Sequence, residues 1–81
     1  MTEQQYQSKI IKEYESKGWY VLKLIKTNKN GIPDLLCLKD GLSPTFIEVK
    51  AANGVVSKLQ EFRISELKKN GFNAFVKQSE K

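Results

Sequence analysis

GIPDLL at residues 31–36, followed after a short turn by FIEVK at residues 46–50, predicts two neighbouring strands of a sheet. Side chains alternate between the two faces of a strand, so Glu48 and Lys50 share one face. The aliphatic residues beside them point to the opposite face. The second run is therefore predicted to place an ionisable pair on one side of the sheet and apolar side chains on the other.

Pro33 marks the start of the first of these strands. Proline has no amide hydrogen and favours an extended residue before it, so it fits the mouth of a strand better than its middle. Asp34 is then predicted to be the first strand residue. Lys39-Asp40-Gly41 is a turn signal between the two runs, and an antiparallel hairpin closed there sets Asp34 beside the end of the second strand, from Glu48 to Lys50.

Asp34, Glu48 and Lys50 together suit metal-dependent cleavage of a phosphodiester. Two close carboxylates repel each other unless a proton or a cation bridges them, and oxygen-only ligands suit Mg²⁺ or Mn²⁺. Such an ion polarises a phosphate and lowers the pKa of a bound water, while a lysine orients the water or offsets developing charge. The alternative is structural, because Glu-x-Lys on an exposed strand is commonly a weak surface pair and Pro-Asp an ordinary turn dipeptide.

The pairing of Pro33-Asp34 with Glu48-Val49-Lys50 resembles the PD-(D/E)XK nuclease signature. The longer string, residues 31–36 with the later Leu59-Gln60, is similar to the VRR-NUC (virus-type replication-repair nuclease) branch of that superfamily. The similarity runs in order along nearly the whole chain. It implies a restriction-endonuclease-like core and a nuclease that uses Mg²⁺ or Mn²⁺.

The resemblance implies a set of active-site groups, which are Asp34 and Glu48 as metal ligands, the Val49 backbone carbonyl as a further ligand, Lys50 as the catalytic lysine and Gln60 as a support from a helix. An acid in the first helix usually completes such sites, and Glu3 is the matching position. An acid in a first turn is also favoured by the helix dipole alone. Both readings of Glu3 stay open, with Gln4 as a contributor in a shifted register.

The first helix is predicted over residues 2–17. Thr2 and Gln5 form a capping box, and Gly18 ends the helix. Four apolar residues recur at helical spacing and are predicted to form a buried stripe: Tyr6, Ile10, Ile11 and Tyr14. Glu3 lies two turns before Ile10, so we expect it on the core-facing side.

A strand over residues 19–26 is apolar on both faces, which predicts an inner position in the sheet. The polar connector after it, residues 27–31, leads directly to Asp34. Lys26 and Lys29 are therefore candidate phosphate contacts, and ordinary solvated lysines are the alternative.

A second helix is predicted from a Ser57 cap to Asn70-Gly71, with an apolar side of Leu59, Phe62 and Leu67. Gln60 completes a capping box with Ser57, so a purely structural account of this glutamine also stands. Lys58 and Arg63, expected at exposed positions, are candidate phosphate contacts. A last strand is predicted over residues 72–76.

Composition bounds the class of protein. Eighty-one residues allow one domain, residues 1–81, and a net charge of +5, from 14 Lys and Arg against 9 acids, favours a polyanionic partner. No histidine is present, which argues against zinc, and the single Cys37 is expected in the core. No stretch resembles a membrane span or a signal peptide, so we expect a cytoplasmic protein with no membrane partner.

The predicted fold is α/β, a mixed four-stranded sheet of order αβββαβ flanked by helices, with its last two strands parallel. The predicted function is a Mg²⁺- or Mn²⁺-dependent, structure-specific deoxyribonuclease. The family resemblance suggests branched DNA such as four-way (Holliday) junctions in replication or repair, a homodimer, and the stand-alone phage or prophage type. The alternatives are a non-catalytic DNA-binding module and a nuclease subunit inactive without a partner.

Overall fold

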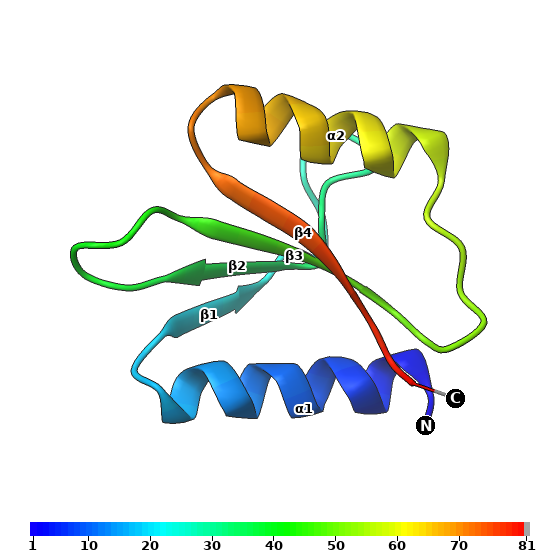
Figure 1. Ribbon diagram of the computed structural model, residues 1–81, viewed down its shortest axis with the longest axis horizontal. Helices are drawn as coiled ribbons and strands as arrows, with labels where there is room; N and C mark the ends of the chain where they lie inside the picture. The colour runs from blue at the N-terminus through cyan, green and yellow to red at the C-terminus, as the bar shows by residue number, and fades with distance from the viewer. Residues whose placement is uncertain (81) are drawn as a thin grey trace.

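The computed structural model describes residues 1–80, which form two helices and a mixed four-stranded sheet. The elements in chain order are α1 (Glu3–Ser16), β1 (Tyr20–Lys23), β2 (Leu35–Leu38), β3 (Thr45–Lys50), α2 (Lys58–Lys69) and β4 (Asn73–Gln78). The two helices lie on opposite sides of the sheet (Figure 1). The predicted order αβββαβ is confirmed, and it is consistent with a restriction-endonuclease-like fold.

The strands follow one another across the sheet in the order β1-β2-β3-β4. β1 pairs with β2 and β2 with β3 in antiparallel fashion, whereas β3 and β4 are parallel. The parallel pair requires a crossover, and α2 provides it. In the β2–β3 register Leu35 faces Ile47, so Asp34, one residue earlier, comes beside Glu48 as predicted.

The main core lies between α1 and the sheet. Its fully buried members come from α1, β2 and β3 and are Ile10, Leu35, Cys37, Ile47 and Val49. The strand members recur with period two, which is the pattern of a strand with one face on a core. Cys37 is therefore a buried core residue, as expected, and burial raises the pKa of its thiol to about 11.

β1 differs from the sequence-based prediction. It is a four-residue strand at the edge of the sheet, not an inner strand over residues 19–26. Its Val21 packs on the α1 side, while Tyr20 and Leu22 on the other side are 67% and 38% exposed. α2 packs over β4, so it leaves this side of β1 uncovered.

Both helices have the predicted capping boxes. Thr2 caps α1 with Gln5, and Ser57 caps α2 with Gln60. The predicted apolar side of α2 is correct only in part, because Leu67 is half-buried whereas Leu59 and Phe62 are exposed. The buried residue is Ile64, because the helix turns this position to the sheet, whereas Leu59 and Phe62 are 43% and 56% exposed.

The last strand also differs slightly, since β4 begins one residue later and ends two residues later than predicted. At the C-terminal end of β4, the Gln78 side chain reaches the loop after β3. Neither helix in the described part of the chain has the length and apolarity needed to cross a membrane.

Candidate active site

Asp34 lies at the open end of the β2–β3 hairpin, beside the C-terminal end of β3. It directly precedes β2, and its Oδ2 accepts a hydrogen bond of 2.8 Å from the backbone N–H of Val49. The N–H and C=O of one strand residue point to the same neighbour, so the Val49 carbonyl also faces this side. The hairpin thus brings the Asp34 carboxylate to the backbone of Val49.

Glu48 is the buried acid of the site, with only 2% of its surface exposed. Its Oε2 lies 3.5 Å from the Lys50 ammonium and accepts a hydrogen bond of 3.2 Å from the Gln60 side chain. Its Oε1 is buried and has no hydrogen-bond partner among residues 1–80. A buried carboxylate oxygen without a partner is costly, so this atom calls for a proton or a cation.

The electrostatic environment of Glu48 favours its neutral form. Burial, followed by the nearby negative charge of Asp34, raises the pKa of Glu48 to about 7, while Lys50 acts in the opposite direction. The two carboxylates are therefore so close that the negative charge on Asp34 disfavours ionisation of Glu48. A bound cation would relieve that competition.

Gln60 both caps α2 and contacts Glu48. Its Oε1 accepts a hydrogen bond of 2.9 Å from the Ser57 backbone, which completes the cap of α2. Its Nε2 donates to Glu48 at the same time. One amide therefore joins the start of α2 to the buried acid on β3.

The start of α2 also holds the connector that leads to Asp34. A Cβ placed on Gly31 would lie 2.7 Å from Cγ of Leu59, and Gly31 has φ +81°, so glycine is required on both counts. The Arg63 side chain donates a hydrogen bond of 2.8 Å to the Asn30 carbonyl and pairs with Glu66. Leu59 and Gln60 thus contact the connector and the buried acid, respectively.

A loop between β3 and α2 packs against Lys50. A Cβ on Gly54 would lie 3.3 Å from Cβ and Cδ of Lys50. The Gln78 side-chain nitrogen lies 2.7–3.2 Å from three carbonyl oxygens of this loop, at Ala51, Ala52 and Gly54. The end of β4 therefore braces the loop that confines the lysine.

Glu3 is not where the sequence placed it. The first five residues are exposed and α1 becomes covered only from Tyr6 onward, so Glu3 lies outside the core-facing stripe. Within residues 1–80 no group of three acidic, histidine or cysteine side chains is arranged to hold a metal. The structure brings together Asp34, Glu48, Lys50 and Gln60, and it leaves Glu3 and Gln4 exposed.

The predicted phosphate contacts divide into two groups. Lys26, Lys29 and Lys58 are exposed, as expected. Arg63 is half-buried and bonded to Asn30 and Glu66, because α2 turns it toward the connector. Its predicted exposed position was wrong, and its contact with phosphate stays a prediction.

Gln7 is a residue that the sequence analysis missed. It lies four residues after Glu3 on the same face of α1, and it lines a hollow with Asp34 and Lys23. The sequence feature that could have indicated Gln7 is its spacing of four residues from Glu3, which places both residues on one face of a helix. No sequence motif marks a single glutamine as functional, so the place of Gln7 beside Asp34 is evident only from the fold.

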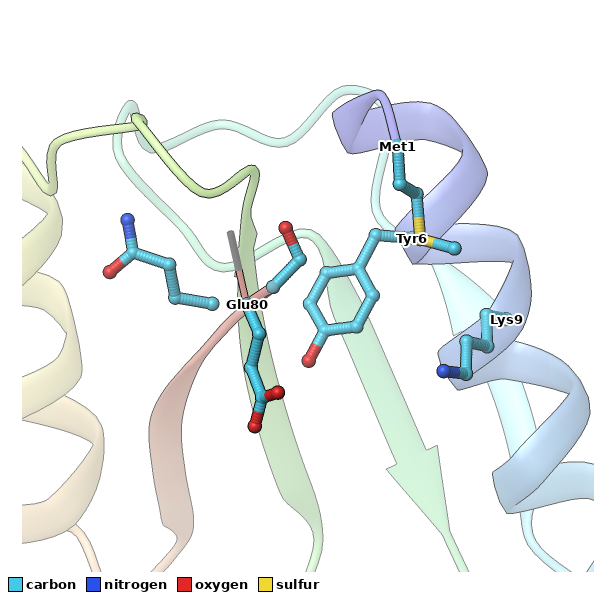
Figure 2. A pocket seen from close by; sticks show the side chains of 6 residues that line it. Met1, Tyr6, Lys9 and Glu80 are labelled. Carbon is cyan, nitrogen blue, oxygen red and sulfur yellow. The ribbon is translucent and has the colours of Figure 1, made fainter.

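A separate hollow of about 410 Å³ lies between the start of α1 and the chain after β4. Figure 2 shows Tyr6 and Lys9 projecting from α1 on one side of it, with Glu80 facing them. None of the residues predicted for the active site lines this hollow.

The fold and the site together define a class of protein. An αβββαβ sheet with an acid before β2, and an acid and a lysine two apart on β3, is the arrangement of a restriction-endonuclease-like nuclease core. The family model described as the VRR-NUC domain matches residues 2–81, so the chain belongs to the VRR-NUC domain family. Membership implies a nuclease module that acts on DNA. A comparison with individual curated proteins found no match.

Proposed function

We propose that this protein is a metal-dependent, structure-specific deoxyribonuclease that hydrolyses phosphodiester bonds in branched DNA. The observation that carries the proposal is the convergence of Asp34, Glu48, Lys50 and Gln60 at one end of the β2–β3 hairpin. Family membership supports nuclease chemistry on DNA. The metal, the branched substrate and the residue roles are our proposal.

The donor set suits Mg²⁺ or Mn²⁺. Two carboxylates and a backbone carbonyl are oxygen ligands, which these hard cations prefer, and the unpartnered Oε1 of Glu48 provides a free donor atom. Asp34, Glu48 and the Val49 carbonyl would hold the ion. A bound cation would supply charge stabilisation at the phosphate and lower the pKa of a bound water.

The protein's own groups act around that centre. The Lys50 ammonium is held beside Glu48 at 3.5 Å, where its positive charge can stabilise negative charge that develops on the phosphate. Gln60 fixes the Glu48 carboxylate by its hydrogen bond of 3.2 Å, so the acid is oriented before substrate binds. Glu3, on the exposed first turn of α1, remains the proposed third acid of the site.

The test is cleavage of labelled single-stranded, duplex, flap and four-way-junction DNA with Mg²⁺, Mn²⁺ or EDTA. The comparison is between the wild type, Lys50→Ala and Lys12→Ala, which removes the same charge from an exposed position of α1. We expect metal-dependent cutting that Lys50→Ala abolishes and Lys12→Ala retains. Absence of cutting by folded wild type would favour a DNA-binding module or a subunit that needs a partner.

We further propose that the protein acts as a homodimer. Tyr20 and Leu22 of β1 expose apolar surface on a side of the sheet that α2 does not cover, and a second copy could bury it. A two-fold dimer presents two equivalent sites, which suits incision of two strands of a junction. Sedimentation of wild type and Leu22→Ser tests this, and a monomeric wild type would contradict it.

A further inference from the structure

Two adjoining hollows lie along the chain from Lys23 to Asp34, and Asp34 lines one of them. The first, about 170 Å³, is lined by Gln7 of α1, Lys23 of β1, Leu24, Ile25 and Asp34. The second, about 220 Å³, is formed by the connector between Leu24 and Ile32. Leu24 and Ile25 line both hollows, so the two hollows adjoin; together they are called the groove, with Asp34 in its first part and the connector in its second.

The groove carries positive charge at regular intervals. Lys23 lines the first hollow, and Lys26 and Lys29 line the second, three residues apart along the chain. None of the three forms an ion pair with an acid within residues 1–80. Asp34 is the one acidic residue among the lining groups. A polyanion that passes Asp34 would therefore meet cations along this path.

Gln7 adds a polar side chain to the first hollow. Within residues 1–80 this side chain forms no hydrogen bond. Its side chain is half-buried, and its amide can donate to a phosphate oxygen and accept from a water. Gln7 comes from α1 and Lys23 from β1, so two separate elements contribute polar side chains to the hollow that Asp34 also lines.

Ile25 supplies the apolar element. It lies between the two hollows and is 90% exposed, more than any other large hydrophobic residue of the described chain. An apolar side chain presented at the rim of a basic groove suits the face of a nucleic-acid base, which proteins contact in this way when bases are unstacked. A groove with cations, an amide and an apolar rim matches a nucleotide strand better than a free phosphate ion.

We propose that this groove binds the single-stranded flank of the DNA substrate next to the cut. Gln7 and Lys23 hold the phosphate adjacent to Asp34, Ile25 packs against the base that follows, and Lys26 and Lys29 guide the next phosphates. This inference rests on the proposed nuclease function, and it adds Gln7, Lys23 and Ile25 as substrate contacts. A regular duplex keeps its bases stacked, so the groove favours DNA with an unpaired segment, as at a branch.

The first test is binding of fluorescein-labelled oligothymidylate in EDTA, followed by anisotropy over a range of salt concentrations. Lys23→Ala is expected to raise Kd about fivefold and to lower the slope of log K against log salt by about 0.7, the value for one phosphate contact on a single strand. Lys23→Arg should restore both quantities. Lys12→Ala is the charge-matched control and should change the slope by much less.

Two further pairs separate the other contacts. Gln7→Ala is compared with Ser8→Ala, an exposed polar residue on the same helix, and Ile25→Ser with Leu42→Ser, which removes apolar surface from the β2–β3 turn. We expect Gln7→Ala and Ile25→Ser each to raise Kd several-fold while their controls bind as wild type. Equal binding by all variants and controls would overturn the proposal that the groove binds single-stranded DNA.

Cleavage by the same proteins distinguishes this inference from the proposed function. If wild type cuts DNA and the groove variants bind and cut like their controls, the nuclease stands and the groove fails. If wild type binds through Lys23 and Ile25 but cuts no DNA, the groove stands and the nuclease fails. With an active enzyme we expect Gln7→Ala to raise KM more than it lowers kcat, as for a residue that positions the strand.

Discussion

Gln60→Glu separates the two roles of this glutamine. A glutamate keeps a side-chain oxygen that accepts from the Ser57 backbone N–H, so the cap of α2 is retained. It loses the Nε2 donor that lies 3.2 Å from Glu48, and it places a second acid beside that buried carboxylate. Hydrogen bonds to charged groups contribute about 1.5–3 kcal/mol. We therefore expect cleavage to fall by roughly 10- to 150-fold, since 1.4 kcal/mol corresponds to about tenfold in rate.

Ser57→Ala is the matched control for the cap. It removes the hydroxyl that accepts from the Gln60 backbone and leaves the Gln60–Glu48 bond in place. Loss of a cap costs about 1 kcal/mol, or about 4–8 °C in Tm for a domain of this size. The assay is single-turnover cleavage with saturating Mg²⁺, beside thermal unfolding. The reasoning is refuted if Gln60→Glu cuts like wild type, or if Ser57→Ala loses as much activity as Gln60→Glu.

Three other predictions concern stability. Because folding raises the pKa of Glu48 from 4.5 to about 7, the folded state binds more protons, so metal-free protein should lose up to about 3 kcal/mol as pH rises through this window; denaturant unfolding of Glu48→Gln should show a flatter profile. Gly31→Ala adds a clash with Leu59 to the strain of a positive φ, so it should destabilise more than Gly41→Ala, which has φ +79° and open space; equal Tm values would contradict the close approach. Mg²⁺ at 100 times its Kd should stabilise wild type by about 2.7 kcal/mol, and calorimetry of Asp34→Ala should show no such gain.

The hairpin at the centre of the fold was predictable because its signals are local. The period-two alternation in β3, Pro33 before β2 and the turn at Lys39–Gly41 all act over a few residues. They were sufficient to place Asp34 beside Glu48. The parallel pairing of β3 and β4 followed from the intervening helix, since a crossover permits that arrangement.

What the sequence did not predict depends on how separate elements meet. β1 is apolar on both faces, and it lies at the edge because β4 joins the sheet beside β3 and not beside β1. Arg63 has an ordinary helical position, and only the return of the connector beneath α2 brings Asn30 to it. Gln7 becomes notable only because α1 places it at the same hollow as Asp34.

The bracing of the lysine loop by β4 has a consequence for the order in which the protein is completed during synthesis. The Asp34–Val49 hydrogen bond joins residues 15 apart, so the acids can come together once the hairpin has left the ribosome. Gln78 reaches back 27 residues to Ala51, and β4 emerges after the other three strands of this sheet. A nascent chain therefore assembles its carboxylates first and fixes the loop at Lys50 last. The loop at Lys50 is therefore fixed only after β4 has been synthesised and has joined the sheet.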